Sequence, residues 1–130
     1  MREIISKSES IAISKLYKKD KQCCLIELNG KKLKTRFLYF EKLKKKLQLN
    51  DSFSNNLNAY SDMMRDAYTY YNKEKIIFLI KHYRHFLEDD PGKDTIEKIF
   101  DDAIIPYFET EIEHMTQNGT ARAIHVYCVM

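Results

Sequence analysis

The chain has 130 residues, of which 44% are hydrophobic and 32% are charged, and its formal net charge is +3. This length and composition suit one globular domain that buries its own core without disulfides or metals. No apolar run approaches the roughly 20 residues that span a bilayer, and the charged amino terminus lacks the apolar core of a secretory signal, so we expect a cytoplasmic protein with no membrane partner.

Residues 1–22 form a basic amino-terminal extension. Within it, residues 11–17 alternate in part between apolar and polar side chains, which allows an edge strand paired in a hairpin with a strand that starts at Cys23. Residues 1–50 carry 14 basic and 5 acidic side chains, whereas residues 51–130 carry 8 and 14. Regions of opposite net charge guide the approach of charged partners. The basic half could therefore attract nucleic acid or an acidic surface, and the acidic half could attract a basic partner.

Three short apolar runs predict strands. They are nearly continuous rather than alternating, as is typical of strands covered on both faces in a small parallel sheet. The segments between them are long enough to supply helical crossovers. The runs are residues 23–28, 76–80 and 123–129. We therefore assign residues 23–130 to one α/β domain.

An amphipathic helix is predicted after the turn at Asn29-Gly30. Its apolar residues recur at helical spacing, lysines fill most of the remaining surface, and Thr35 is placed to cap its start. The apolar residues are Phe37, Phe40, Leu43 and Leu47, and the lysines are Lys42, Lys44, Lys45 and Lys46.

A second helix follows a polar connection at residues 48–55, is capped by Ser54 or Asn55, and runs to about Tyr71. At about 100° per residue it separates into an apolar face and a polar stripe without lysine. A solvated face usually mixes both signs, so this stripe is a candidate docking surface, and a merely solvated face is the alternative. The apolar face holds Phe53, Leu57, Tyr60, Met64 and Tyr68, and the stripe holds Asn55, Asn58, Asp62 and Asp66.

Beyond the second strand, residues 86–92 read as irregular. A further helix is expected to start at Asp94-Thr95, and Pro106 must end or kink it. Asn118-Gly119 is a plausible stop for the last helical stretch before the final strand.

These elements and their order resemble the barstar family of ribonuclease inhibitors over about residues 23–130. From Leu28 to Asp62 the register of the family holds without a gap. The matched positions are Asn29, Gly30, Leu43, Leu47, Leu49, Asn56, Leu57, Ala59 and Asp62. The resemblance implies a small three-stranded parallel sheet packed against helices, with room for an additional amino-terminal strand. It also implies an immunity protein whose second helix and preceding loop occlude the active site of a cognate toxic nuclease.

The resemblance also indicates which residues bind the toxin. Asp62 matches the central acidic anchor of the family, Asn56 matches the asparagine at the start of the helix, and Phe53 takes the place of an aromatic in the binding loop. The family has glycine, aspartate and tryptophan where this chain has Ser54, Asn58 and Ser61, so the target could differ from barnase. The expected toxin-binding residues are Asp62, Asn56, Asn58, Phe53, Asn55, Asp66, Asp51 and Tyr60.

No motif indicates catalysis, because a phosphate loop, a dinucleotide fingerprint, a nucleophile elbow and a zinc signature are all absent. We expect no enzymatic activity, cofactor or metal. His82 and His85 read as structural or surface residues, since no carboxylate or cysteine is recognised at ligand spacing beside them. The cysteines Cys23, Cys24 and Cys128 are expected to be buried free thiols.

The rival hypothesis is a nucleic-acid-binding module that uses the lysine-rich first helix and the basic amino terminus. The inhibitor hypothesis disfavours direct nucleic-acid binding. A scaffold or regulatory role on the same fold stays open, because a fold does not fix a function.

Overall fold

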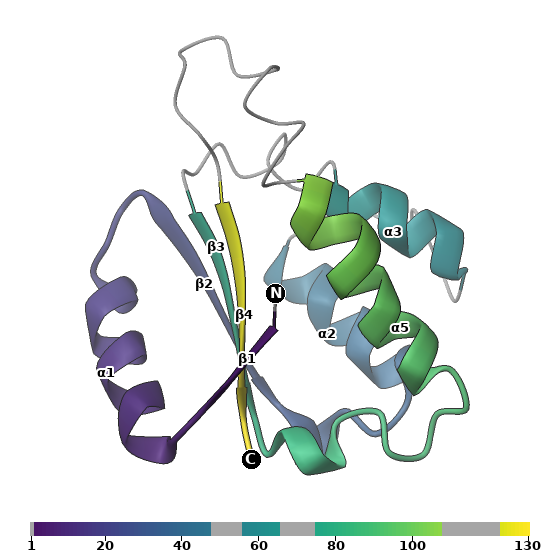
Figure 1. Cartoon of the computed structure of the whole chain (residues 1–130), viewed down its shortest axis with the longest axis horizontal. Helices are drawn as coiled ribbons and strands as arrows, with labels where there is room; N and C mark the ends of the chain where they lie inside the picture. Colours follow the sequence, from purple (N-terminus) through teal and green to yellow (C-terminus); the bar gives the residue numbers. More distant parts are fainter. Residues whose placement is uncertain (1, 48–55, 66–74, 108–122) are drawn as a thin grey trace, which may run out of the picture.

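The computed structural model describes residues 2–47, 56–65, 75–107 and 123–130, and within these ranges the backbone forms one sheet with helices on it (Figure 1). All neighbouring strands are parallel, in the order β1-β4-β3-β2. The strands are β1 Arg2–Ile5, β2 Cys23–Asn29, β3 Lys75–Lys81 and β4 Ala123–Val129. The helices are α1 Lys7–Lys18, α2 Arg36–Lys46, α3 Leu57–Arg65 and α5 Lys93–Ile99, with 3₁₀ turns η1 Gly30–Lys32 and η2 Tyr83–His85 and a π-helical turn η3 Phe100–Ile104.

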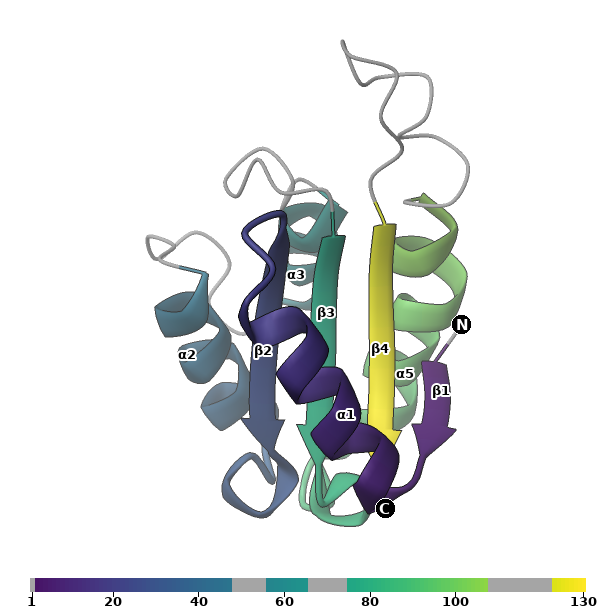
Figure 2. The ribbon, with the colours of Figure 1, turned by 90° about the vertical axis from the view of Figure 1, so that its left-hand side faces the viewer.

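The sheet is covered on both faces, as its continuous apolar strands predict. Helices α2, α3 and α5 lie on one face and α1 lies on the other, as Figure 1 and Figure 2 show from two sides. In the central strand β3, every residue from Ile76 to Ile80 is at most 2% exposed. The α/β class with a parallel sheet and the three predicted strands are confirmed.

The amino-terminal segment differs from the prediction. Residues 11–17 lie in α1, so the predicted hairpin strand is wrong. The helix begins at a capping box in which Ser6 Oγ accepts from the Glu9 N–H and the Glu9 carboxylate accepts from the Ser6 N–H, each at 3.1 Å. The segment does supply an edge strand, but this strand is β1, which pairs in parallel with β4 at the edge opposite β2. The capping box favours a helix at residues 7–18, and this preference is stronger than the preference for a strand that the partial alternation of residues 11–17 indicates.

Helix α2 begins where the sequence predicts, with the Thr35 hydroxyl accepting a backbone hydrogen bond at 3.4 Å. Phe37, which the helical spacing groups with the apolar residues of this helix, does not pack in the core, because its side chain is 56% exposed. Tyr39 lies in the core instead: it precedes Leu43 by about one turn and shares its buried side, whereas Phe37 is turned by roughly 120° from Leu43. The other residues of that group are buried, namely Phe40, Leu43 and Leu47.

The helix after residue 92 passes through Pro106 instead of ending there. α5 continues into the π-helical turn η3, where the Ile105 N–H bonds to the Phe100 carbonyl five residues earlier. Helical conformation then extends through Tyr107. A π turn commonly absorbs a local break in the α-helical hydrogen-bond pattern, so we attribute η3 to the proline that follows it. The stop predicted at Asn118-Gly119 lies outside the described residues.

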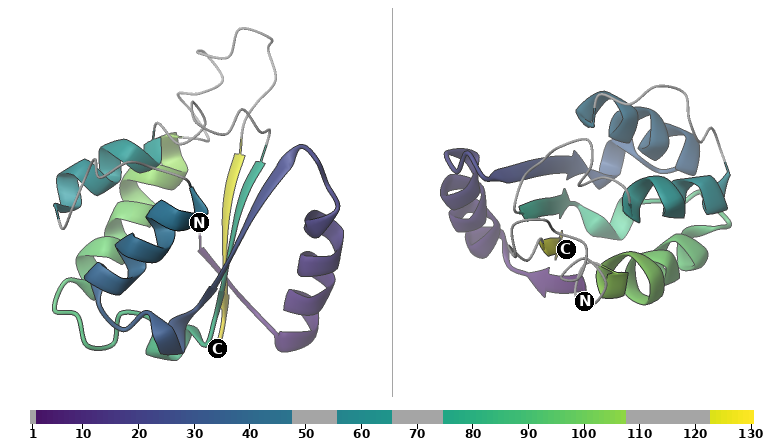
Figure 3. Two further views of the ribbon diagram at one scale, coloured as in Figure 1. Left: turned by 180° about the vertical axis from the view of Figure 1, so that it is seen from behind. Right: turned by 90° about the horizontal axis from the view of Figure 1, so that it is seen from above.

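Figure 3 shows α2, α3 and α5 as one layer on a face of the sheet. The larger cluster of buried side chains lies between this layer and the sheet. Aromatic rings make up its centre. The ring of Tyr39 meets those of Tyr60 and Phe86 edge to face, with centroids 5.7 and 5.0 Å apart. Phe100 joins this group to the sheet by contacting Phe78 of β3 at 5.7 Å. Edge-to-face pairs stabilise a core beyond the area they bury, so this cluster fixes the helices relative to one another.

Candidate functional site

The amino-terminal end of α3 is held by Asn56. Its side-chain oxygen accepts hydrogen bonds from the backbone N–H groups of Asn58 at 2.8 Å and Ala59 at 3.2 Å. Its carbonyl accepts the first intrahelical bond, from the Tyr60 N–H, at 2.9 Å. Asn56 is therefore the N-cap. The prediction of Ser54 or Asn55 as the cap is wrong, and both of those residues lie outside the described ranges.

Helix α3 has a buried side and an exposed polar side, as its sequence predicts. Tyr60 and Met64 are completely buried and Met63 is 7% exposed. Asn58 and Asp62 are exposed. Residues four apart lie on the same side of a helix, one turn apart, so the Asn58 amide and the Asp62 carboxylate share one face. The described part of α3 thus presents a short polar stripe away from the core.

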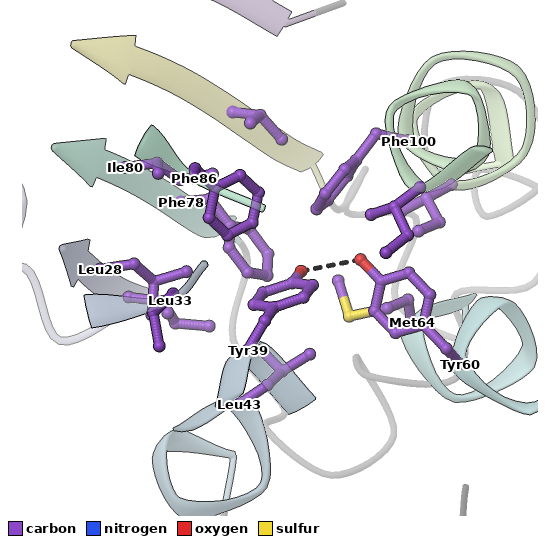
Figure 4. Close-up of a cluster of buried hydrophobic side chains, with 14 of the residues drawn as sticks. Leu28, Leu33, Tyr39, Leu43, Tyr60, Met64, Phe78, Ile80, Phe86 and Phe100 are labelled. Atoms are coloured by element: carbon purple, nitrogen blue, oxygen red, sulfur yellow. Dashed lines mark hydrogen bonds between the residues drawn. The ribbon is translucent and has the colours of Figure 1, made fainter. Parts of the chain in front are cut away.

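Tyr60 belongs to the core, so its prediction as a toxin-binding residue is wrong. Its hydroxyl and that of Tyr39 lie 2.7 Å apart in a hydrogen bond between α3 and α2 (Figure 4). Its ring also stacks on Phe40, with centroids 4.9 Å apart. Burial raises the pKa of both phenols above the ordinary value, so both remain protonated. The partner of the Tyr60 hydroxyl is Tyr39, whose spacing to Leu43 indicates the buried side of α2 but not the contact with Tyr60.

The start of α2 is fixed by the loop that follows β3. The Asp90 carboxylate accepts hydrogen bonds from the Arg36 N–H at 2.7 Å, from Arg36 Nη2 at 3.1 Å and from the Gly92 N–H at 2.7 Å. Burial alone would raise the pKa of Asp90, but these hydrogen bonds outweigh it and hold that pKa below the ordinary value. The Leu87 N–H also bonds to the Leu33 carbonyl at 2.9 Å. The helix that supports α3 is therefore tied down at its own start.

Half of the predicted toxin-binding residues lie outside the described ranges. Those within them are Asn56, Asn58, Tyr60 and Asp62, of which the structure places Asn58 and Asp62 together on an exposed face, Asn56 at the cap and Tyr60 in the core. The residues outside are Asp51, Phe53, Asn55 and Asp66.

The histidines form no metal site in the described part of the chain, where no group of three or more potential ligands occurs. Contrary to the sequence-based expectation, His85 does have a carboxylate beside it: His85 Nδ1 lies 3.1 Å from Glu88 Oε2. His82 takes a left-handed backbone conformation at φ 51° just before η2. All three cysteines are free thiols, with Cys23 and Cys128 buried and Cys24 partly exposed.

The lysine-rich helix α2 is less uniformly cationic than its sequence suggests. Lys44 Nζ lies 2.8 Å from Glu41 Oε1, and the Lys44 side chain is only 11% exposed. Lys42 and Lys45 are exposed. Because one of the four lysines is turned against its own helix, the surface that the nucleic-acid hypothesis requires is smaller than predicted.

The fold and this site define a small α/β domain that exposes a polar helix face suited to contact with another protein. A family model described as Barstar (barnase inhibitor) matches residues 24–118, most of the chain. The chain belongs to the barstar family, which places it at family level among ribonuclease inhibitors and makes a ribonuclease the expected class of partner. No curated protein matches it. Among the described helices, none is long and apolar enough to cross a membrane.

Proposed function

We propose that this protein is an immunity protein that binds a cognate toxic ribonuclease and occludes its active site with α3 and the loop before it. Membership of the barstar family supports the inhibitor class. The observation that carries the proposal for this site is the exposed pair Asn58 and Asp62 on a helix whose other side is locked in the core. The inhibitor would protect the cell that produces the ribonuclease, in its cytoplasm.

The electrostatic reason is that a ribonuclease must hold the phosphates of RNA, and so builds a cationic cleft. A carboxylate such as that of Asp62 is attracted to the same cleft and can take the place of a phosphate there. Long-range attraction raises the rate of association, whereas desolvated pairs at the centre of the interface keep the complex together.

Rigidity is the second requirement, because ordering a flexible segment on binding lowers the affinity. The cap by Asn56 and the buried contacts of Tyr60 and Met64 hold the described part of α3 in one orientation before any partner arrives. The helix can therefore present Asn58 and Asp62 with little loss of conformational entropy on binding.

The neutral side chain of Asn58 bears on the choice of target. An amide donates as well as accepts hydrogen bonds, whereas a carboxylate only accepts them. With one carboxylate fewer on this face, we propose that the target is a ribonuclease whose cleft offers an acceptor opposite Asn58, and which is therefore distinct from barnase.

The test is isothermal titration of the purified protein against its cognate ribonuclease, to be sought first among neighbouring genes, with cleavage of RNA as a second readout. Asp62→Ala should weaken binding at least about tenfold. Glu3→Ala is the matched control, since it removes the same charge from an exposed residue of the edge strand β1. Equal effects of the two substitutions would show that α3 is not the binding face. A parent protein that binds the ribonuclease without blocking the cleavage of RNA would show that it does not occlude the active site.

A further inference from the structure

A groove runs along β2, at the edge of the sheet opposite β1. Two hollows of about 360 and 250 Å³ lie along this strand and share Glu27. The first is lined by Glu27, Asn29, Lys32, Leu33, Leu38, Glu41, Lys42 and Lys45, and the second by Tyr17, Lys18, Cys23, Leu25, Glu27 and Lys46. Alternate β2 residues from Cys23 to Asn29 thus line a groove whose sides come from α1 and α2. In Figure 2, α2 lies beside β2 and α1 crosses the face of the sheet in front of the strands.

The backbone of β2 faces this groove. In the sheet that the described residues form, β2 is the last strand and pairs only with β3, from Cys23 to Asn29. Alternate residues of an edge strand direct their N–H and C=O groups away from the sheet, where they can pair with one further strand. The seven residues of β2 therefore offer a template as long as β3.

The sides of the groove are cationic. Lys32, Lys42 and Lys45 surround the first hollow, and none of them forms an ion pair within the described part of the chain. Lys18 and Lys46 extend the cationic surface to the second hollow.

The two acidic residues of the groove are already engaged. Glu27 accepts a hydrogen bond from the Ser14 hydroxyl of α1, and Glu41 is paired with Lys44. A hydrogen bond from a hydroxyl leaves the charge of Glu27 in place, but the two carboxylates are outnumbered by the five lysines that line the hollows, so the groove has an excess of positive charge.

We infer that this groove binds an extended, acidic peptide segment of a partner protein, which adds to β2 as a fifth strand. The backbone of the segment would continue the ladder of the sheet, and its carboxylates would meet the lysines of α1 and α2. This surface is separate from the exposed face of α3, and its occupation does not depend on the proposed inhibition of a ribonuclease.

The lysines by themselves would also suit two different roles. Lysines beside an edge strand can serve only to prevent strand pairing and aggregation, in which case no peptide binds. A single-stranded nucleic acid could also be attracted by the charge, but it has no peptide groups with which to continue the β2 ladder. The peptide is favoured because the hollows follow the strand edge itself.

The experiment is an NMR titration of the full, ¹⁵N-labelled chain with a synthetic ten-residue peptide of alternating glutamate and valine. Three controls accompany it: a lysine-valine peptide, a glutamate-valine peptide N-methylated at every peptide bond so that neither of its edges can donate to β2, and a twelve-residue oligouridylate. Lys45→Glu is compared with Lys98→Glu, a matched charge reversal at an exposed residue of α5.

We expect saturable shifts and slower amide exchange in residues 23–29 with the glutamate-valine peptide, and neither with the lysine-valine or N-methylated peptide. Lys45→Glu should weaken binding about fivefold, and Lys98→Glu by less than twofold. No saturation at about 1 mM peptide overturns the inference in favour of a protective role for the lysines. Equal binding by the N-methylated peptide, or binding of the oligouridylate alone, also overturns it.

Discussion

The hydrogen bond between the hydroxyls of Tyr39 and Tyr60 allows a direct measurement of what holds α3 in place. Both side chains are 0% exposed and the two oxygens lie 2.7 Å apart. Tyr60→Phe removes one hydroxyl and leaves that of Tyr39 buried without its partner. An unsatisfied buried hydroxyl costs about 1–3 kcal/mol, more than the net value of the bond itself.

The assay is urea denaturation followed by circular dichroism. With a slope of about 2 kcal/mol per molar urea, the midpoint for Tyr60→Phe should fall by roughly 0.5–1.5 M. The double variant Tyr39→Phe/Tyr60→Phe should recover part of this loss, because the orphaned hydroxyl is removed as well. Tyr17→Phe in the half-buried side of α1 is the control and should stay within about 0.5 kcal/mol of the parent. A single variant as stable as the parent, or a double variant less stable than Tyr60→Phe, would refute the reasoning.

Three further outcomes follow from the described contacts. Gly30→Ala should destabilise the protein by about 1–3 kcal/mol in thermal denaturation, because a Cβ there would lie 2.2 Å from the His82 carbonyl oxygen; an unchanged melting temperature would contradict this. Asp90→Asn should be less stable than the parent at pH 7, with a gap in urea midpoint that narrows as the pH falls below about 4. The folded-state pKa of Asp90 is lowered, so its contribution is present above the unfolded pKa and lost on acidification; a gap independent of pH would contradict the assignment. Asn56→Ala should lower the free energy of unfolding, measured by urea denaturation, by about 1 kcal/mol, because α3 loses its cap. Asn56→Asp keeps the capping oxygen and should lower it by less.

The parts of the fold that the sequence predicts correctly are those with a strong local signal. The three apolar runs form adjacent parallel strands, and the Thr35 cap fixes the start of α2. The prediction for the amino-terminal segment is wrong because its partial alternation competes with the capping box at Ser6 and Glu9, which is the stronger of two local signals. The place of β1 beside β4 depends on a pairing across more than 120 residues, which no local pattern contains.

In the candidate site, too, the features with a local sequence signal are predicted correctly and those that depend on distant contacts are not. The separation of α3 into a buried and an exposed side follows from its periodicity, and Asn58 and Asp62 lie on the exposed side as predicted. Tyr60 belongs by sequence both to the apolar face and to the predicted toxin-binding set, and only its burial decides between them. A tyrosine on an apolar helix face is ambiguous in sequence because its ring favours the core and its hydroxyl needs a partner. That partner, Tyr39, lies in another helix.

The basic and acidic halves of the sequence do not form two separate faces of the molecule. Some basic side chains of the first half are instead paired with carboxylates of the second half. Arg2, from the basic half, donates to Asp101 and Glu97 at 2.9 and 2.6 Å and so attaches β1 to α5 and η3. Arg36 and Asp90 connect α2 to the loop after β3 in the same way. The cations of the basic half without an ion pair in the described ranges include Lys32, Lys42 and Lys45 beside β2, whereas Asp62 lies on α3. Binding must therefore be attributed to local surfaces with a definite charge, since the net charge of each half says little about what either surface can bind.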